Sequence, residues 1–333
     1  MKRVLCLVSA ALLSVPAFAA DPLPALGADA AHISVSGLSS GAFMAVQYQV
    51  AYSASVIGAG IVAGGPYYCA AGQLANAALC MGQQAPAPDP APMLAAARGF
   101  AAGRRIDALS NLVRQRVYVF SGTQDTVVRQ KAVDATVAFY RLAGLPAANI
   151  AYVHTVPAGH AFITPAFGNA CAANAAPYVS QCRVDGQGYD QAGALLQQIH
   201  GHLKPPAATL SGRIVAFDQR AFAAASSGMA AEGYLYVPAA CRGGGCSIHV
   251  ALHGCQQSAA KVGDDVYAHA GYNRWADSNA MLVLYPQVES SLLPFNPQGC
   301  WDWFAYTGPG YATRQAPQMK AIRAMVERLG QAR

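Results

Sequence analysis

Apolar and polar positions along this chain predict strands and helices in regular alternation. Short apolar runs rich in β-branched residues predict strands over 32–36, 55–64, 116–120, 150–156, 213–217, 234–237, 247–252 and 281–285. Apolar residues at helical spacing predict helices over 43–50, 106–114, 127–142 and 316–329. This alternation predicts a mostly parallel α/β sheet flanked by helices. No break in composition divides it, so we expect a single domain over 20–333.

The first 19 residues have the pattern of a secretory signal peptide. Lys2 and Arg3 precede an apolar run over 4–15, and Ala17-Phe18-Ala19 has the small-x-small form of a cleavage site. The run is too short to span a membrane. We therefore expect a mature chain that begins near Ala20 and is secreted, to the periplasm or to the cell exterior.

Charge argues against a nucleic-acid partner. The chain has 22 Lys and Arg; without Lys2 and Arg3, 20 basic residues face 16 acidic ones, so the net charge is +4. No Lys/Arg cluster is present. Charged residues make up 11% of the chain and hydrophobic residues 54%, which indicates a weakly charged surface that tolerates apolar contacts.

The cysteine count predicts disulfides. Nine cysteines, less Cys6 in the signal peptide, leave eight, and an even number in an exported chain favours four bridges. The spacing alone leaves the connectivity open. The simplest pairing joins sequence neighbours, as Cys69–Cys80, Cys171–Cys182, Cys241–Cys246 and Cys255–Cys300. No C-x-x-C or His-x-x-x-His pattern indicates zinc, so no metal site is expected.

One serine lies where a catalytic nucleophile would lie. Gly37-Leu38-Ser39-Ser40-Gly41 joins a predicted strand to a predicted helix, as in the G-x-S-x-G nucleophile elbow. On these five residues alone, a plain turn in an Ala/Gly-rich protein is an equal alternative.

Two further residues complete a Ser, acid, His order that is typical of α/β hydrolases. Asp125 and His160 each follow a predicted strand, as Ser39 does. The competing residues fit less well. His154 falls within a strand, His200 and His202 end a helix, Asp107 and Asp134 fall on helices, and Asp302, the second choice of acid, comes after the histidine.

The predicted oxyanion donors indicate a rearranged chain. One donor is expected from the backbone N–H of Ser40, and the second from Cys255 in the loop His253-Gly254-Cys255. In the ordinary hydrolase order that loop precedes the nucleophile, whereas here it follows some 200 residues later. Moving residues 205–333 ahead of residue 20 restores the order, so the sequence predicts a circularly permuted α/β-hydrolase.

With these residues assembled, the chain resembles the single-domain poly(3-hydroxybutyrate) depolymerases, which are secreted esterases with a permuted α/β-hydrolase fold. The resemblance lies in SGLSSGAFMA at 36–45, AGGPYYCA at 63–70, GTQD at 122–125, AGHAF at 158–162, ALHGCQQS at 251–258, AGYNRWADSN at 270–279 and NPQGCWDWF at 296–304. It implies Ser39, Asp125 and His160 as the triad, Ser40 and Cys255 as oxyanion donors, and Trp301 or Trp303 beside the scissile ester. Many such depolymerases add a linker and a polymer-binding module. We expect neither here, and hence action on amorphous polymer or soluble oligomers.

The expected function is that of a secreted serine esterase without metal or organic cofactor, acting on a polyester or oligoester. Tyr67, Tyr68, Phe43, Trp301 and Trp303 are candidates for an aromatic rim that holds substrate, although each also suits a core. Two alternatives stay open: an esterase of feruloyl or acetyl groups on plant-wall polysaccharides, and a non-catalytic polymer-binding or carbohydrate-binding protein. No membrane, nucleic-acid or obligate protein partner is expected.

Overall fold

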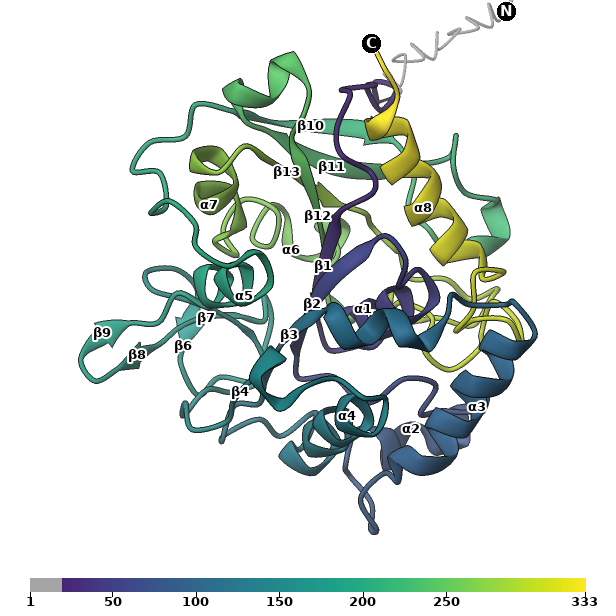
Figure 1. The fold of residues 1–333 in the computed structure, drawn as a ribbon. Coiled ribbons are helices and arrows are strands. Elements are labelled where there is room, and N and C mark those ends of the chain that lie inside the picture. Colours follow the sequence, from purple (N-terminus) through teal and green to yellow (C-terminus); the bar gives the residue numbers. More distant parts are fainter. Residues whose placement is uncertain (1–19) are drawn as a thin grey trace, which may run out of the picture.

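An eight-stranded sheet runs through residues 20–333, the part of the chain that the computed structural model describes (Figure 1). The predicted signal peptide, residues 1–19, lies outside the described residues. In spatial order the strands are β10 (Arg213–Asp218), β11 (Glu232–Val237), β13 (Met281–Tyr285), β12 (Ser247–Leu252), β1 (Ile33–Leu38), β2 (Val56–Val62), β3 (Arg116–Phe120) and β4 (Ile150–Val153). Of these eight, only β11 runs opposite to the rest, which confirms the mostly parallel sheet.

Helices cover both faces of this sheet, which is why the central strands are apolar on both sides. Figure 1 shows α5 (Gln191–His200), α6 (Ala259–Val262) and α7 (Tyr272–Ser278) on one face. The other face carries α1 (Ser40–Ala51), α3 (Pro90–Ala102), α4 (Gln130–Leu142) and α8 (Pro317–Gly330), and the single turn α2 (Ala77–Cys80) follows β2. No helix in residues 20–333 is long and apolar enough to cross a bilayer.

One predicted helix is shorter and of another type. The segment 106–114 forms a 3₁₀ helix over Leu109–Arg114 only, so the prediction that Asp107 lies on a helix was wrong. Asp107 is not a solvated surface residue either. Its carboxylate accepts the Ala54 N–H at 2.9 Å and pairs with Arg314 at 2.7 Å. The other 3₁₀ helices are Leu74–Asn76, Ala147–Asn149, Ala225–Ser227 and Ala239–Gly243.

A segment between His160 and α5 forms small sheets of its own. Three parallel strands, in the order β5 (Phe162–Thr164), β7 (Val179–Gln181) and β6 (Asn169–Ala170), lie beside the hairpin of β8 (Arg183–Val184) and β9 (Gln187–Gly188). The Cys171–Cys182 disulfide crosslinks this segment.

The order of strands in the sheet confirms the predicted circular permutation. The C-terminal half supplies β10 to β13 and the N-terminal half supplies β1 to β4, and the halves join where β12 pairs with β1 in parallel. The two ends of the described chain meet beside α8, where the N–H groups of Leu26 and Ala28 donate to the carbonyl of Leu329 at 3.1 and 3.0 Å. Together with this sheet order, the contact gives the permuted α/β-hydrolase arrangement predicted from the sequence.

The four disulfides join the sequence neighbours, as the simplest pairing predicted. They are Cys69–Cys80, Cys171–Cys182, Cys241–Cys246 and Cys255–Cys300. Each closes a loop outside the main sheet, so the bridges stabilise connections rather than the core.

Candidate active site

Ser39 lies on the tight turn between the central strand β1 and helix α1. Its φ of 57° and ψ of −121° form a left-handed conformation that a residue with a side chain adopts only under constraint from its surroundings. The flanking glycines are required by close approach. A Cβ on Gly37 would overlap the backbone of Gly41, and a Cβ on Gly41 would overlap the carbonyl oxygen of His253. The strand, turn and helix predicted around Ser39 are therefore confirmed.

Asp125 lies in the loop after β3 and faces His160. Its Oδ1 accepts the backbone N–H groups of Val127 and Val128 at 2.8 and 2.9 Å. Its Oδ2 lies 2.8 Å from Nδ1 of His160. Both side chains are buried, with 1% and 5% of their surface exposed, so water competes little for this contact. Asp125 thus holds the imidazole with Nε2 left for another partner.

His160 follows β4 and is held from its backbone as well. Its N–H donates to Oδ1 of Asn174 at 3.0 Å, and the same oxygen accepts the N–H of Thr126 at 3.0 Å. The amide of Asn174 donates in turn to the carbonyl of Gln124 at 3.0 Å. Asn174 therefore ties the loop of Asp125 to the loop of His160, a contact that sequence reasoning missed because it comes from an irregular segment.

Ser39 and His160 line the same pocket, of about 110 Å³. Its lining contains no Lys, Arg, Asp or Glu; the residues are Ser39, Ser40, Phe43, Met81, Val127, His160, Tyr178, Cys255, Gln256 and Trp303. The structure thus brings together the predicted nucleophile, the predicted base with its acid, and both predicted oxyanion donors.

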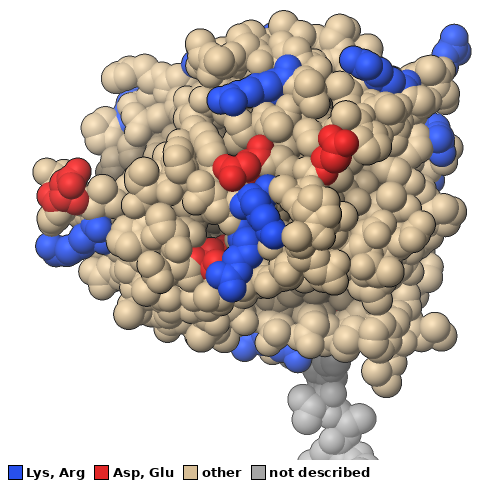
Figure 2. All heavy atoms as spheres, turned by 90° about the horizontal axis from the view of Figure 1, so that it is seen from below, with Lys and Arg blue, Asp and Glu red and all other residues tan. Residues whose placement is uncertain are grey.

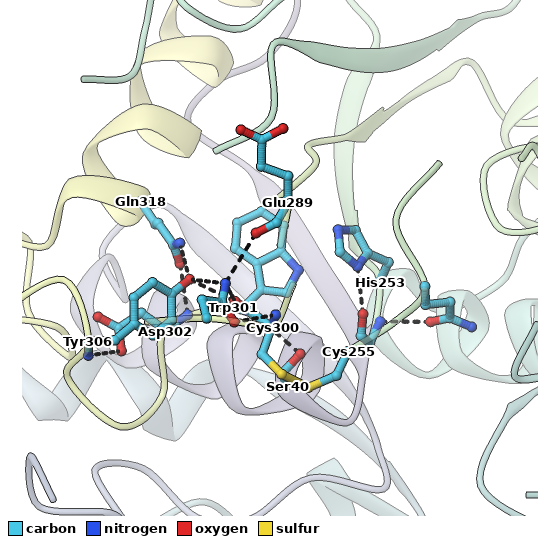
Figure 3. The surroundings of a disulfide bond; sticks show 12 residues. Ser40, His253, Cys255, Glu289, Cys300, Trp301, Asp302, Tyr306 and Gln318 are labelled. Atoms are coloured by element: carbon cyan, nitrogen blue, oxygen red, sulfur yellow. Dashed lines mark hydrogen bonds between the residues drawn. A yellow bond between two sulfur atoms is a disulfide. The ribbon is translucent and has the colours of Figure 1, made fainter. Parts of the chain in front are cut away.

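The two predicted oxyanion donors approach Ser39 from different elements. Ser40 is the first residue of α1, so its N–H has no partner within the helix. Cys255 follows β12, the strand that pairs with β1, which brings its loop beside the elbow. The Cys255–Cys300 disulfide links that loop to the segment of Trp301, whose N–H donates to Oγ of Ser40 at 3.3 Å (Figure 3).

The structure separates the five aromatic residues that were predicted as a rim. Trp303 and Phe43 line the pocket and stack on each other at 4.4 Å between ring centroids. Trp301 was expected as an equal candidate but is completely buried, with its ring against His253. The direction of the loop decides between the two tryptophans, and only Trp303 faces the pocket.

The two tyrosines do not belong to the rim. Tyr67 is completely buried and donates its hydroxyl to the carbonyl of Ala312 at 2.7 Å, so it is a core residue. Tyr68 is half-buried, stacks on Tyr311 at 5.4 Å between ring centroids, and does not line the pocket. The structure places neither tyrosine at the pocket, contrary to what we expected, because the bend after β2 turns both toward neighbouring aromatic residues.

The competing histidines and carboxylates lie outside the pocket. His154 is exposed just past the end of β4, and Asp134 is exposed on α4. His200 donates to or accepts from Oγ of Ser34 at 2.9 Å, on the far side of the sheet from the elbow helix. Asp302 is buried and accepts the N–H groups of Ala305 and Thr307 at 2.7 and 2.8 Å, so it shapes its own loop.

An apolar groove continues from the pocket, and sequence reasoning did not find it. It has about 300 Å³ and shares Met81, Cys255 and Trp303 with the pocket. The loop beside it exposes Leu292 and Leu293, at 84% and 93%. Charged residues are also few on the face that Figure 2 shows, where Lys and Arg lie scattered among a few Asp and Glu. The groove and pocket therefore suit a neutral, apolar chain.

Comparison with known proteins identifies relatives over nearly the whole chain, although no family model matches it. A poly(3-hydroxybutyrate) depolymerase of Delftia acidovorans is 43% identical over 318 residues, or 93% of this chain; the match spans 62% of that protein's length. A polyhydroxybutyrate depolymerase of Talaromyces funiculosus is 38% identical over 328 residues, which are 93% of each chain.

The solved structures agree with the sequence comparison. The crystal structure of PHB depolymerase from Penicillium funiculosum has a TM-score of 0.83 and 35% identity, covering 92% of this chain and 98% of that one. A PHB depolymerase complexed with an R3HB trimer matches with the same TM-score of 0.83. On this shared sequence and fold, the chain belongs to the poly(3-hydroxybutyrate) depolymerase family.

Proposed function

We propose that this protein is a secreted serine esterase that hydrolyses the ester bonds of poly(3-hydroxybutyrate) or its oligomers. The observation that carries the proposal is that His160, paired with the buried Asp125, lines one pocket with the strained Ser39. An acid, a base and an activated hydroxyl in this order form the constellation that acyl transfer requires.

In the first half of the reaction, Oγ of Ser39 attacks the ester carbonyl and its proton passes to Nε2 of His160. The oxyanion of the tetrahedral intermediate accepts hydrogen bonds from the N–H groups of Ser40 and Cys255, and each bond contributes about 3 kcal/mol of transition-state stabilisation. The C–O bond of the ester then breaks, and His160 returns the proton to the leaving alcohol. Asp125 stays ionised and stabilises the imidazolium.

In the second half, water repeats the cycle on the acyl-enzyme. His160 takes a proton from water, the hydroxide oxygen attacks the Ser39 ester, and the tetrahedral intermediate collapses to a free acid. Ser39 recovers its proton from His160. Each turn thus consumes one water and yields one carboxylic acid and one alcohol, with no step that requires a metal or an organic cofactor.

The substrate class follows from the pocket and its relatives. A 3-hydroxybutyrate chain carries no charge except at its acid end and has a methyl group on every unit, which suits the uncharged pocket and the apolar groove beside it. Trp303 and Phe43 hold the chain beside the scissile ester in this proposal. The R3HB trimer bound by a structural relative supports the same assignment.

Export and domain organisation belong to the same proposal. The predicted signal peptide and the four disulfides support secretion, because such bridges persist in oxidising compartments. The sheet takes four strands from each half of the chain, which supports one catalytic domain over 20–333.

The test compares substrates and labels the nucleophile. Purified protein is assayed on poly(3-hydroxybutyrate) film, on the soluble trimer and on feruloyl and acetyl xylan, with a fluorophosphonate probe in parallel. We expect release of 3-hydroxybutyrate and labelling that disappears in Ser39→Ala but persists in Ser226→Ala, an exposed serine outside the pocket. Turnover of the xylan esters alone would contradict poly(3-hydroxybutyrate) as the proposed substrate. Absence of labelling would indicate a non-catalytic binding protein.

A further inference from the structure

The two peptide units that meet at Gly254 are each held by a buried side chain. The carbonyl oxygen of Gly254 lies 2.7 Å from Nδ1 of His253. The N–H of Gly254 donates to Oε1 of Gln257 at 2.7 Å. His253 and Gln257 are each only 1% exposed, so water does not replace either contact.

The hydrogen bonds of His253 fix its tautomer. The backbone N–H of Val288 donates to Nε2 at 3.1 Å, and a backbone N–H can only donate, so Nε2 is unprotonated. In the neutral ring Nδ1 then carries the proton and donates to the carbonyl of Gly254. Burial lowers the pKa of His253 to about 4, which keeps the ring neutral at neutral pH.

Planarity transmits this contact to the oxyanion donor. In a trans peptide the C=O and the next N–H point in opposite directions. Because His253 holds the carbonyl of Gly254, the N–H of Cys255 points away from His253. No hydrogen-bond partner for that N–H is found within residues 20–333, and Cys255 lines the pocket with Ser39.

We propose that His253 is a positioning residue that sets the direction of the Cys255 N–H and thereby the oxyanion hole. The proposal rests on the proposed function, because it assumes that Ser39 forms a tetrahedral adduct. His253 does not touch substrate; it acts only through the peptide unit. The Cys255–Cys300 disulfide restrains the side chain of the same residue, and His253 restrains the backbone that the disulfide leaves free to turn.

Gln257 is the second anchor of the same loop. Its Nε2 donates to the carbonyls of Pro177 and Tyr178, both at 2.9 Å. Tyr178 lines the pocket, and its ring lies 6.0 Å from the ring of His160. Gln257 therefore fixes the oxyanion loop against the wall beside the base, while His253 sets the rotation of the peptide.

A pair of amide variants separates the two hydrogen bonds of His253. His253→Asn keeps an N–H donor near the position of Nδ1 and loses the acceptor for Val288. His253→Gln keeps an acceptor near the position of Nε2 and loses the donor for Gly254. Each variant gives up one hydrogen bond, so a role in stability alone affects both similarly.

The measurements are kcat and KM on the soluble 3-hydroxybutyrate trimer, and the inhibition constant of a trifluoromethyl ketone, whose adduct carries the oxyanion. We expect His253→Gln to lower kcat about thirtyfold and to raise the inhibition constant of the ketone by a similar factor, while KM stays within about twofold of its original value. We expect kcat of His253→Asn to stay within about threefold of the unmodified protein.

Equal losses in the two variants, or an unchanged kcat in His253→Gln, would overturn the proposal. Should either variant fail to fold, Gln257→Met provides the second test, because Gln257 anchors the same loop. A lower kcat at constant KM supports positioning of the Cys255 N–H by the side chains that hold this loop, and an unchanged kcat refutes it. Ser39→Ala, measured in the same assays, distinguishes failure of the proposed function from failure of the inference about His253. If it retains activity, the proposed function itself fails; if it is inactive while the His253 variants are unaffected, only this inference fails.

Discussion

Replacing Asn174 with Ala tests whether Asp125 and His160, the proposed acid and base, depend on one connecting side chain. Asn174 is half-buried and makes four hydrogen bonds. Its Oδ1 accepts the N–H groups of Thr126 and His160, both at 3.0 Å. Its Nδ2 donates to the carbonyls of Gln124 and Ala172, at 3.0 and 3.1 Å. The substitution removes all four without touching the Asp125 or His160 side chains.

The magnitude follows from these bonds. A hydrogen bond of this kind contributes about 1 kcal/mol net, and water replaces part of it at a half-exposed site, so we expect about 2 kcal/mol lower stability. The loops of Asp125 and His160 then lose their common anchor. A loss of about 1.4 kcal/mol in transition-state stabilisation corresponds to about a tenfold fall in kcat.

Asn169 provides the matched control. It lies in the same disulfide-linked segment, is also half-buried, and donates to the carbonyls of Ala175 and Ala176, both at 3.0 Å. Asn169→Ala removes two hydrogen bonds rather than four, so we expect it to lower stability in urea by about 1 kcal/mol and to keep kcat within about twofold. If Asn174→Ala and Asn169→Ala have the same kcat, Asn174 contributes only to folding and the reasoning is refuted.

Three further results are expected. Gly41→Ala places a methyl group against the carbonyl of His253 and should lower the unfolding free energy in urea by about 3 kcal/mol; an unchanged midpoint would contradict the close packing of the elbow. Replacing Cys255 and Cys300 with Ser opens a loop with a sequence separation of 45 and should lower the free energy of unfolding by about 4 kcal/mol. The same replacement of Cys69 and Cys80, with a separation of 11, should lower it by about 3 kcal/mol, and thermal unfolding measures both. Burial lowers the pKa of His200 to about 4, below its ordinary 6.5, so the unfolded chain binds the proton more readily. Its contribution of about 3 kcal/mol is complete above pH 6.5 and is lost as the pH falls toward 4. Burial also lowers the pKa of His249 and His253, so His200→Gln should reduce, without abolishing, the pH dependence of the urea midpoint over that interval; an unchanged slope would contradict this source of acid sensitivity.

The predictable part of the site is the part that strands position. Ser39, Asp125 and His160 each follow a strand of the sheet, and an apolar run of the right length reveals such a strand in the sequence. Cys255 was predictable for the same reason, because it follows β12. Parallel strands bring their carboxyl ends to one edge of the sheet, so the residues that follow these strands could be expected to lie close together from the sequence alone.

The site predictions that differ from the structure depend on the direction of side chains in irregular loops. Tyr67 and Trp301 lie in segments without periodicity, and nothing in the sequence distinguishes a ring turned inward from one turned toward the pocket. Their burial depends on distant partners, such as Ala312 for the hydroxyl of Tyr67. Asn174 and His253 were missed as structural anchors for the same reason, because their partners include backbone atoms of other loops, such as the N–H of Val288 for His253.

The junction between β1 and β12 has a consequence for when the protein becomes active. Ser34 on β1 reaches its partner His249 on β12 across 215 positions of the chain. A ribosome adds about 5 to 20 residues per second, so roughly 10 to 40 s separate the synthesis of these two strands. During that interval the central strand keeps one edge open to wrong partners. A nascent chain can hold Ser39, Asp125 and His160, yet it gains Cys255, the proposed second oxyanion donor, only when the last third of the chain has arrived.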